Sequence, residues 1–339
     1  MEYTGRFNRL ITHLKNCLGS PFGVLKSYKM EHIQLGLCCI NTILRDQKPP
    51  VFASRTVMLK TFLTNGPPYD KIIQNLKDIV TMMQWNHKNG IHVFRLSSDI
   101  FPHKANPQAP DYTFDFARDL LKDIGIKSRE LGQRLTFHPG QYNVIGTPRQ
   151  EVFEHTVTEL THHADILDLM GLDHNSVIVI HGGGVYVNKN LTKQRWCKQF
   201  KLLPEHVRSR IVIENCEKNF SIVDCLEISE ELDIPVVFDT HHFACYKILH
   251  PDEIFNNAEY YIGDILKSWK GIRPKFHISE QGKGKLGHHS DYVQNIPEYL
   301  LEIPKLYHTP IDIMVEAKMK EQAIFYLYKK YSNYCLPCN

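Results

Sequence analysis

The sequence contains no long hydrophobic run. Its 339 residues are 42% hydrophobic and 23% charged, and no apolar stretch approaches the roughly 18 residues that a membrane-spanning helix needs. The N-terminal stretch, MEYTGRFNRLITHLKNCLGS, also lacks the apolar core of a secretory signal. These absences predict a globular intracellular protein with no membrane partner.

The sequence also lacks a strong net charge. The formal charge is only +3, so no global basic field indicates nucleic acid, and any such binding must come from local groups of basic residues. Histidine, by contrast, is abundant, with 19 copies, and imidazole is the commonest metal ligand among side chains. The positions of the histidines therefore carry the functional information.

A disulfide framework is not indicated. The nine cysteines are an odd number, and several lie inside apolar runs, which is typical of reduced thiols packed as small hydrophobic side chains. Cys335 and Cys338 form a lone CxxC at the C-terminal end. Zinc would need two more ligands nearby, so we interpret this pair as an uninvolved tail. The pattern predicts a reducing intracellular compartment, without distinguishing nucleus from cytoplasm.

Eight short β-rich runs recur along the chain. Most are continuously apolar, as strands covered on both faces are, and segments with helical spacing separate them, among them 69–86, 112–131, 151–170 and 225–232. Strand followed by helix, eight times over, predicts a (β/α)8 TIM barrel, with a doubly wound open sheet as the alternative. The predicted strands are IQLGLCCI (33–40), IHVFRLS (91–97), RLTFH (134–138), SVIVIH (176–181), RIVIEN (210–215), PVVFDT (235–240), PKFHIS (274–279) and IDIMVEA (311–317).

The domain organisation is predicted to be simple. No linker rich in Gly, Ser or Pro, no internal repeat and no low-complexity tract interrupts the series. We therefore predict one barrel domain over residues 33–339, with residues 1–32 as an N-terminal extension.

Imidazole and carboxylate side chains lie at the C-terminal ends of six predicted strands. In a closed parallel barrel these ends converge on one face around one axis. Buried carboxylates there would cost several kcal/mol unless divalent cations compensated their charge. The candidate metal ligands, with one histidine in the loop after the seventh strand, are His138, His181, Glu214, Asp239, His242, His277, His289 and Glu316.

Each of these residues alone has a simpler interpretation. A single histidine at a strand end is usually a hydrogen-bonded structural residue, and the same chemistry at six strand ends is what favours metal binding. Either neighbour in the pairs 241–242 and 288–289 could be the ligand. His162 and His163 lie on a predicted helix and are weaker candidates.

The donor set predicts a cluster of ions. Eight ligands exceed the needs of one ion, so we expect two or three divalent ions about 3.5–4 Å apart, bridged by Glu214 and Glu316. Mixed imidazole and carboxylate ligation suits Mn²⁺, Zn²⁺ or Fe²⁺ better than Ca²⁺. Mn²⁺ is the expected ion, with Zn²⁺, Mg²⁺ and Co²⁺ as alternatives. Such a cluster suits phosphodiester hydrolysis, because one ion activates water and another neutralises the leaving oxygen.

Residues 33–327 resemble the UV damage endonuclease family, relatives of endonuclease IV. The resemblance implies a (β/α)8 barrel that cuts double-stranded DNA immediately 5′ to ultraviolet photoproducts, both pyrimidine dimers and (6-4) adducts, and that leaves a 3′-hydroxyl and a 5′-phosphate. It implies activity at abasic sites, no nucleotide cofactor, and a Mn²⁺-type cluster on the eight ligands named above. The motifs that carry it are IQLGLCCIN, SRT (54–56), RLSSDIFP, FHPGQYNVIGTP, HGGGVYVNK, RIVIENCEKNFSIVDCLEI, IPVVFDTHH, PKFHIS, HHSDY and DIMVEAKMKE.

The chain departs from the family pattern at one position. The family's SSxxFPxxSHP ends in a histidine ligand, whereas SSDIFPHKANP places Asn106 there. Because an amide oxygen binds divalent metals weakly, we expect one metal position to be less occupied, or His103 to supply a ligand from three residues away.

Contacts to DNA are predicted beyond the ligands. The resemblance implies that Gln141 and Tyr142 fill the base stack when damaged bases are turned out, tyrosine as a stacking face and glutamine as a hydrogen-bonding wedge. It also places Asn41 near the lesion. Three glycines after His181 permit close approach to a phosphate, and basic residues of the loop after the seventh strand suit phosphate contact. The expected contacts are Gln141, Tyr142, Asn41, Tyr186, Lys189, Lys283 and Lys285.

Lys275 is predicted to differ from the other basic residues. With His277, two positions later, it points to one face of its strand, into the barrel. It could bind a phosphate oxygen, become carbamylated as the resemblance implies, or form an ordinary buried ion pair. Lys270 and Arg273 precede this strand, and we expect them at the opposite end, in contact with solvent. The expected catalytic residues are Glu214, His242, Lys275 and Glu316.

Three rival functions stay open. A metal-dependent sugar isomerase uses a similar barrel but needs no stacking residue, so the pair Gln141 and Tyr142 argues against it. An abasic-site endonuclease of the endonuclease IV type is a nearer rival, and the FHPGQY and MVEAK motifs favour the photoproduct enzyme. Asn106 motivates a damage-binding protein that no longer cuts. We predict a monomer acting on double-stranded DNA that contains UV lesions.

Overall fold

The structure, a computed structural model, describes residues 33–332 and 334. The predicted N-terminal extension over residues 1–32 and the pair Cys335 and Cys338 lie outside the described residues. Within the described part, no helix combines the length and the apolar character needed to cross a membrane.

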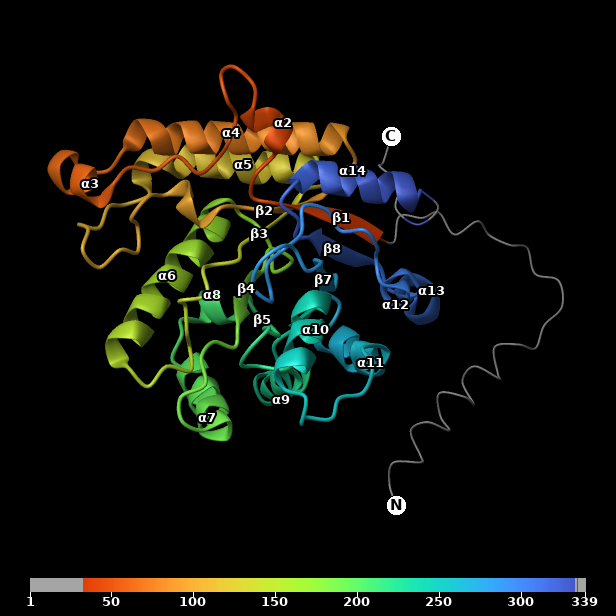
Figure 1. The fold of residues 1–339 in the computed structure, drawn as a ribbon. Coiled ribbons are helices and arrows are strands. Elements are labelled where there is room, and N and C mark those ends of the chain that lie inside the picture. Colours follow the sequence, from red (N-terminus) through yellow and green to blue (C-terminus); the bar gives the residue numbers. More distant parts are fainter. Residues whose placement is uncertain (1–32, 333, 335–339) are drawn as a thin grey trace. The chain divides into compact units, whose positions relative to one another are not determined.

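Eight parallel strands form the centre of the fold, at the eight places where the sequence predicts them (Figure 1). Neighbouring strands pair in the order β3-β2-β1-β8-β7-β6-β5-β4. Their apolar side chains are buried almost throughout, as expected for strands covered on both faces. The strands are β1 (Ile33–Cys38), β2 (Val93–Arg95), β3 (Arg134–Thr136), β4 (Ile178–His181), β5 (Ile211–Glu214), β6 (Val236–Asp239), β7 (Lys275–Ile278) and β8 (Ile311–Val315).

The two ends of this order, β3 and β4, meet through a residue just beyond β3. Phe137 pairs with Ile178 in a parallel bridge. Its amide donates to the carbonyl of Val177 at 3.0 Å, and its own carbonyl accepts from the amide of Val179 at 2.9 Å. These contacts bring the strands into a nearly closed barrel. The prediction of a (β/α)8 barrel is confirmed, and the alternative of an open doubly wound sheet is wrong.

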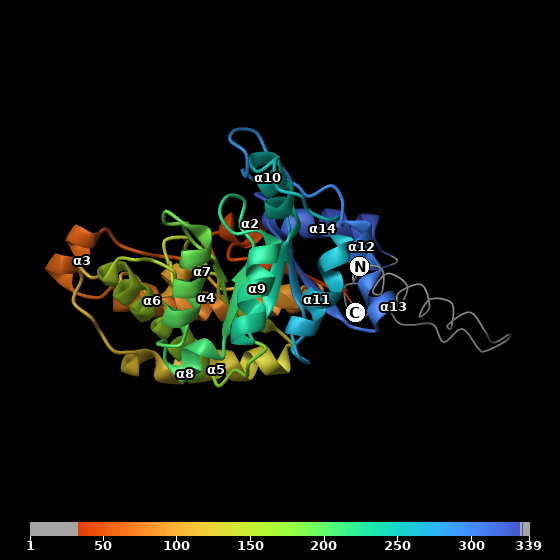
Figure 2. The ribbon, with the colours of Figure 1, turned by 90° about the horizontal axis from the view of Figure 1, so that it is seen from below.

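Helices surround the strands, as Figure 1 and the view from below in Figure 2 show. Three predicted helices, at 69–86, 151–170 and 225–232, are confirmed. The helices are α2 (Thr42–Arg45), α3 (Leu59–Asn65), α4 (Tyr69–Lys88), α5 (Arg118–Glu130), α6 (Gln150–Leu169), α7 (Lys189–Phe200), α8 (Glu205–Arg208), α9 (Ile222–Leu232), α10 (Thr240–Leu249), α11 (Glu259–Ser268), α12 (Glu298–Leu301), α13 (Ile303–Tyr307) and α14 (Lys320–Lys330), with 3₁₀ turns η1 (Ser98–Ile100) and η2 (Asp115–Ala117).

The helix predicted over 112–131 begins later than expected, at Arg118. Its first residues instead anchor a loop by their aromatic side chains. The hydroxyl of Tyr112 donates to the carbonyl of Pro102 at 2.9 Å, and the ring of Phe114 contacts that of Phe101 edge to face at 4.9 Å between centroids. These tertiary contacts outweigh the local helical spacing.

The N-terminal ends of the strands are tied together by buried ion pairs. Asp312 on β8 is fully buried and pairs with Arg134 at 2.7 Å and with Arg273 at 2.5 Å. The expectation that Arg273 only contacts solvent is therefore wrong, because it neutralises a buried carboxylate. The ion pairs at this end of the barrel therefore stabilise the fold. The polar residues that could catalyse a reaction lie at the C-terminal ends of the strands.

Candidate metal centre

Glu214, the last residue of β5, lies at the centre of a group of imidazoles. Its side chain is fully buried. Nε2 of His138 lies 2.8 Å from Oε2 and Nε2 of His181 lies 3.3 Å from the same oxygen. On the other oxygen, Nδ1 of His277 lies 2.9 Å away and Nδ1 of His242 lies 3.5 Å away. Residues from the ends of β3, β4 and β7 and from the start of α10 thus meet at one carboxylate.

Asp239 positions His242 through the start of a helix. It is the N-cap of α10, and its Oδ1 accepts from the backbone amide of His242 at 2.7 Å, which satisfies one of the free donors at a helix N-terminus. Asn215 fixes the same turn by donating to the carbonyl of Asp239 at 3.0 Å and accepting from its amide at 2.9 Å. The capping geometry therefore explains why DTHH follows the apolar strand.

Glu316, just after β8, forms the second carboxylate of the centre. Its Oε1 lies 3.5 Å from Nδ1 of His277, and its Oε2 lies 3.8 Å from Nε2 of His289. The same carboxylate pairs with Arg95 from the end of β2. Burial opposes the ionisation of Glu316, but Arg95 and His277 hold its pKa well below the usual range.

Four buried atoms of the centre are left without hydrogen bonds. Oε2 of Glu214, Oδ2 of Asp239, Nε2 of His181 and Nε2 of His277 form no hydrogen bond of normal angular geometry within residues 33–332 and 334. Buried polar atoms of native proteins are nearly always paired. Because these orphaned atoms are imidazole nitrogens and carboxylate oxygens, the donor set fits divalent cations.

Burial and mutual contacts shift the pKa values of the side chains in the centre. Burial lowers the pKa of His138 to about 4 despite the adjacent Glu214, so its ring is neutral near pH 7. Burial opposes the ionisation of Glu214, but His277, His181 and His138 hold its pKa well below the usual range. Burial would also lower the pKa of His242, yet the nearby carboxylates, Asp239 first, raise it to about 9. This surplus of negative charge is what a bound cation would neutralise.

The structure distinguishes the members of the two histidine pairs. His242 and His289 face the carboxylates, whereas His241 contacts Sγ of Cys245 at 3.6 Å and His288 is exposed. The sequence could not predict which histidine of each pair contacts a carboxylate, because this depends on how α10 and the loop after β7 are oriented.

His103 and Asn106 do not join the metal centre. Nε2 of His103 contacts the carbonyl of Val57 at 2.8 Å, and its Nδ1 lies 3.3 Å from Nδ2 of Asn106. Both residues line a pocket that also contains Tyr142. The structure places both side chains in this pocket. A metal-ligating role for His103 or Asn106 therefore stays a prediction.

Lys275 points into the barrel, as predicted, and its side chain is fully buried. Its Nζ donates to Oγ1 of Thr136 at 2.8 Å. Burial, with Arg134 and Arg95 acting in the same direction, lowers its pKa to about 7. No ion pair is formed by this amine within the described residues, so the interpretation of Lys275 as half of a buried ion pair finds no support.

The residues predicted to read the lesion lie on the loop after β3. Gln141 and Tyr142 are both exposed, and the side chain of Tyr142 is 58% accessible. A Cβ atom on Gly140 would lie 2.4 Å from the ring of Tyr142, so glycine is needed for the ring to lie over this backbone. An accessible aromatic face on the loop that follows His138 is compatible with base stacking.

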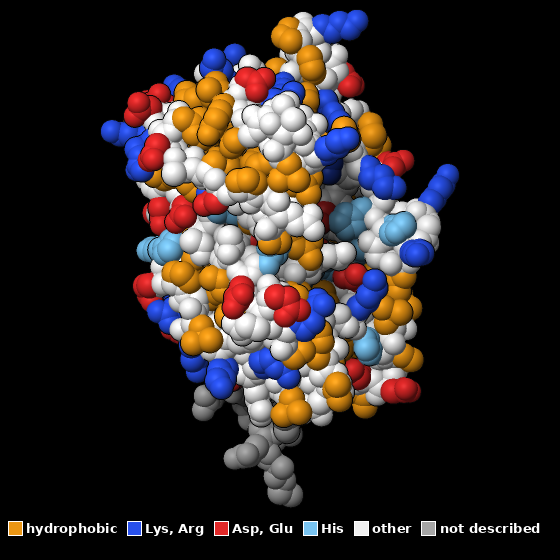
Figure 3. All heavy atoms as spheres, turned by 90° about the vertical axis from the view of Figure 1, so that its left-hand side faces the viewer, with side chains coloured by type: hydrophobic (Ala, Val, Ile, Leu, Met, Phe, Trp, Pro, Cys, Tyr) orange, Lys and Arg blue, Asp and Glu red, His pale blue; other side chains and the backbone are white. Residues whose placement is uncertain are grey.

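The other predicted DNA contacts lie in varied surroundings. Lys283 and Lys285 are exposed on the loop after β7, and Figure 3 shows Lys and Arg side chains around a hollow that contains histidine. Lys189 instead holds Asp224 at 3.1 Å and the hydroxyl of Tyr246 at 2.5 Å. Asn41 is fully buried and caps α2. Their roles in DNA binding stay predictions.

Two of the three glycines of HGGGVYVNK are explained by packing. A Cβ atom on Gly182 would lie 2.4 Å from the ring of Phe220, and one on Gly183, whose φ is 89°, would lie 2.6 Å from Val144. The half-buried Tyr186 follows on the same loop. Close approach of this backbone to a phosphate is therefore not required to account for Gly182 and Gly183.

Sequence reasoning missed Arg95. This residue ends β2 in the run VFRLS and pairs with Glu316. The signal was present, because a charged residue at the end of an apolar strand is the same feature that identified Glu214. Arg95 adds a fixed positive charge to the wall of the metal centre.

Comparisons with known proteins agree with this geometry. The family model described as UV-endonuclease UvdE matches residues 33–336. A putative UV-damage endonuclease of Acanthamoeba polyphaga mimivirus is 39% identical over 88% of this chain and 91% of that protein. The UV-damage endonuclease of Schizosaccharomyces pombe is 35% identical over 90% of this chain, which spans about half (52%) of the length of that relative.

A solved structure shows the same fold. The crystal structure of SacUVDE has a TM-score of 0.76 and 30% sequence identity to this chain, over 89% of this chain and 99% of that one. The family match extends over nearly all of the described barrel. The chain therefore belongs to the UV-endonuclease UvdE family of metal-dependent DNA-repair endonucleases.

Proposed function

We propose that this chain hydrolyses the phosphodiester bond immediately 5′ to pyrimidine dimers and (6-4) adducts in double-stranded DNA, and that it also acts at abasic sites. The products would be a 3′-hydroxyl and a 5′-phosphate. The observation that carries the proposal is the convergence of four imidazoles on the buried carboxylate of Glu214, at the barrel end beside an exposed tyrosine.

Three groups of side chains would hold two or three divalent ions, with Mn²⁺ favoured by the mixed nitrogen and oxygen donors. The ligand atoms of each group lie within 4.8 Å of one another. When bound, such ions supply an activated water and neutralise charge on the leaving oxygen. The groups are His138, His181 and Glu214; Glu214, Asp239 and His242; and His138, His277 and Glu316, with His289 beside Glu316.

The protein side chains would orient the damaged strand. Tyr142 and Gln141 would occupy the stack beside the turned-out bases, since a photoproduct stacks weakly and costs less to extrude than an intact pair. Lys283 and Lys285 would contact phosphates from the loop after β7. Inside the barrel, Lys275 would contribute either a phosphate contact or, as a carbamate, an additional anionic group beside the ions.

A paired incision assay tests this proposal. One end-labelled duplex with a single photoproduct and the same duplex without it are incubated with the protein, with Mn²⁺ and with chelator. We expect a single nick 5′ to the lesion, only on damaged DNA and only with the metal. The 3′ end should be a substrate for polymerase extension without further processing.

The same assay separates the alternatives. Retardation of damaged DNA without nicking would indicate a damage-binding protein, and cutting of abasic DNA alone would indicate an abasic-site endonuclease. Neither binding nor cutting of any duplex would favour a sugar isomerase. Any of these three results would contradict the proposed photoproduct incision.

A further inference from the structure

A second group of metal-ligating side chains lies outside the metal centre. A cavity of about 280 Å³ lies between α6 and the segment from Ser98 to Pro107, and Tyr142 is part of its wall. Glu159, His162 and His163 of α6 offer ligand atoms that lie within 4.8 Å of one another. None of these residues belongs to the groups around Glu214 and Glu316.

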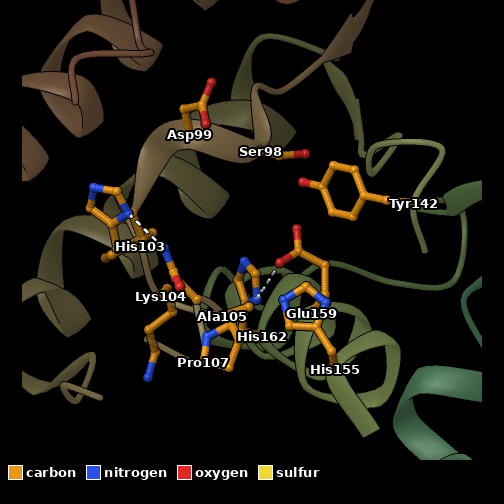
Figure 4. Close-up of a pocket in the computed structure, with 12 residues that line it drawn as sticks. Ser98, Asp99, His103, Lys104, Ala105, Pro107, Tyr142, His155, Glu159 and His162 are labelled. Atoms are coloured by element: carbon orange, nitrogen blue, oxygen red, sulfur yellow. Dashed lines mark hydrogen bonds and ion pairs between the residues drawn. The ribbon is translucent and has the colours of Figure 1, made fainter. Parts of the chain in front are cut away.

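The helix presents three of its potential ligands on one face. His155, Glu159 and His162 are four and three residues apart on α6 and all line the cavity. Residues at such spacing lie one above the other on a helix surface. Figure 4 shows their side chains next to one another, below the ring of Tyr142. Of these three residues, Glu159 and His162 have ligand atoms within 4.8 Å of each other, and His155 lies one turn away on the same face.

His162 and His163 differ in their hydrogen bonding. His163 uses both ring nitrogens, with Nδ1 on the carbonyl of Glu159 at 2.6 Å and Nε2 on the hydroxyl of Ser98 at 3.1 Å. His162 is only 6% exposed, and its Nδ1 forms no hydrogen bond of normal angular geometry within the described residues. This nitrogen lies 3.9 Å from Oε2 of Glu159, too far for a hydrogen bond. Both ring nitrogens of His163 are therefore used in hydrogen bonds that hold the fold. His162 has a buried ring nitrogen without a well-aligned partner, which could ligate a metal ion.

Glu159 has a buried charge that the chain does not compensate. Its side chain is 9% exposed, and its carboxylate accepts no hydrogen bond from any residue of the described part. Burial first, and then the nearby Asp99, raise the pKa of Glu159 to about 7. The ammonium of Lys104, which also lines the cavity, is engaged by Asp111 and by the carbonyl of Tyr112. A cation beside Glu159 would remove this cost.

We propose that this cavity binds a divalent transition-metal ion of the Zn²⁺ type through the carboxylate of Glu159 and the Nδ1 of His162, and that His155, which also lines the cavity, turns its ring toward the ion as a third ligand. Nitrogen and carboxylate oxygen are ordinary zinc ligands, and a site with three protein ligands leaves one position open. Asp99 and Tyr142 also line the cavity. The ion would be held by side chains of α6, in the cavity whose wall includes Tyr142, and the proposal goes beyond the incision reaction because none of its ligands takes part in that reaction.

Metal counting tests the proposal without reference to activity. The full chain, stripped with chelator and dialysed against Zn²⁺, is compared with Glu159→Gln and His162→Ala by elemental analysis. We expect each variant to bind one ion fewer per chain than the unmodified protein. The matched control is Glu154→Gln, an exposed position on the same helix, which should bind the same number as the unmodified protein. Equal counts in all four proteins would overturn the proposal.

A second measurement guards against misfolded variants. His155 is half-buried, so His155→Ala should leave the fold intact while weakening Zn²⁺ binding by about tenfold or more, as loss of one ligand commonly does. Co²⁺ bound in the cavity should contribute visible absorption bands in addition to those of the metal centre, and the difference spectrum between the unmodified protein and Glu159→Gln should show them, whereas the difference spectrum with Glu154→Gln should be flat. Unchanged Zn²⁺ affinity in His155→Ala would show that His155 is not a ligand. Absorption bands in Glu159→Gln equal to those of the unmodified protein would contradict the proposed site.

Discussion

Glu214 is the side chain on which the geometry of the metal centre depends most. Four imidazoles lie within 3.5 Å of its two oxygens. We predict that Glu214→Gln, which keeps the size and removes the charge, slows incision about a thousandfold or more, because loss of bound cations removes several kcal/mol of transition-state stabilisation. Binding to damaged DNA should change little, as measured by gel retardation alongside the nicking rate.

His242→Ala should act in the same direction, since His242 lies between Asp239 and Glu214. The exposed Glu151→Gln serves as control for the loss of one carboxylate. Incision rates of Glu214→Gln and His242→Ala equal to that of the control would show that the reaction does not need this centre.

Tyr142 acts at the residue scale through its exposed ring. Tyr142→Ala should reduce the preference for irradiated over intact DNA by ~1–3 kcal/mol, the usual contribution of stacking between a base and an aromatic side chain. Tyr142→Phe should retain most of the preference. Competition binding with the two duplexes measures it, and Tyr260→Ala, at a tyrosine of α11 with 52% exposure, is the control. A preference that survives in Tyr142→Ala would refute the stacking role.

Lys275 should give the protein a characteristic pH dependence. Burial lowers the pKa of Lys275 from 10.5 to about 7. Between pH 7 and pH 10.5, the amine of Lys275 is therefore protonated in the unfolded chain and largely neutral in the folded chain. The stability contributed by this site therefore rises with pH through that window. Lys275→Met should lack this rise. Urea unfolding of both proteins in chelator, from about pH 7 to pH 10, measures the difference in slope, and equal slopes would contradict the lowered pKa.

At the scale of elements, one glycine sets the distance between two helices. A Cβ atom on Gly125 of α5 would lie 1.6 Å from the carbonyl oxygen of Met170, at the end of α6. We predict that Gly125→Ala lowers the free energy of unfolding by ~1–3 kcal/mol, because the helices must separate.

The matched control is the same substitution at an open helical position. A Cβ atom on Gly263 of α11 would have no neighbouring atom within 4 Å, and alanine is the better helix former. Gly263→Ala should therefore raise the free energy of unfolding by ~0.5–1 kcal/mol. Urea denaturation of both variants measures the two effects, and a shift of the same sign in both would exclude helix contact as the cause.

On the scale of the whole molecule, the barrel is joined between β3 and β4 by the pairing of Phe137, whereas the other neighbours pair as regular strands. The proposed metal ligands His138 and His181 lie at the ends of these two strands, so bound cations would hold the two together. We predict that chelation speeds hydrogen exchange at the amides of Phe137 and Val179 more than at the β1–β8 pair, because opening there breaks fewer contacts.

Mass spectrometry of exchange with and without chelator measures this difference. Amides of Leu35 and Ile313, in the β1–β8 pair, are the internal reference. Equal acceleration at both places would indicate that metal removal loosens the barrel uniformly, which would contradict a local role at the junction.

The architecture and most of the centre could be predicted from local sequence. Apolar runs such as SVIVIH and RIVIEN are strands in any context that covers both faces, and charged residues at their ends, such as Glu214, indicate chemistry because burial without compensation is costly. The order of strands then places these ends on one face. Because parallel strands end on the same face, residues more than a hundred positions apart could be assigned to one candidate metal centre.

Other features depended on tertiary contacts that no local pattern encodes. His242 rather than His241 faces the carboxylates because Asp239 caps α10. His103 and Asn106 do not point to the centre because their side chains line the cavity beside α6. Gly182 and Gly183 allow close packing against Phe220 and Val144. The sequence by itself determined which residue types stand at the strand ends, and only the folded chain decided which side chains face one another, because orientation is set by packing between elements distant in sequence.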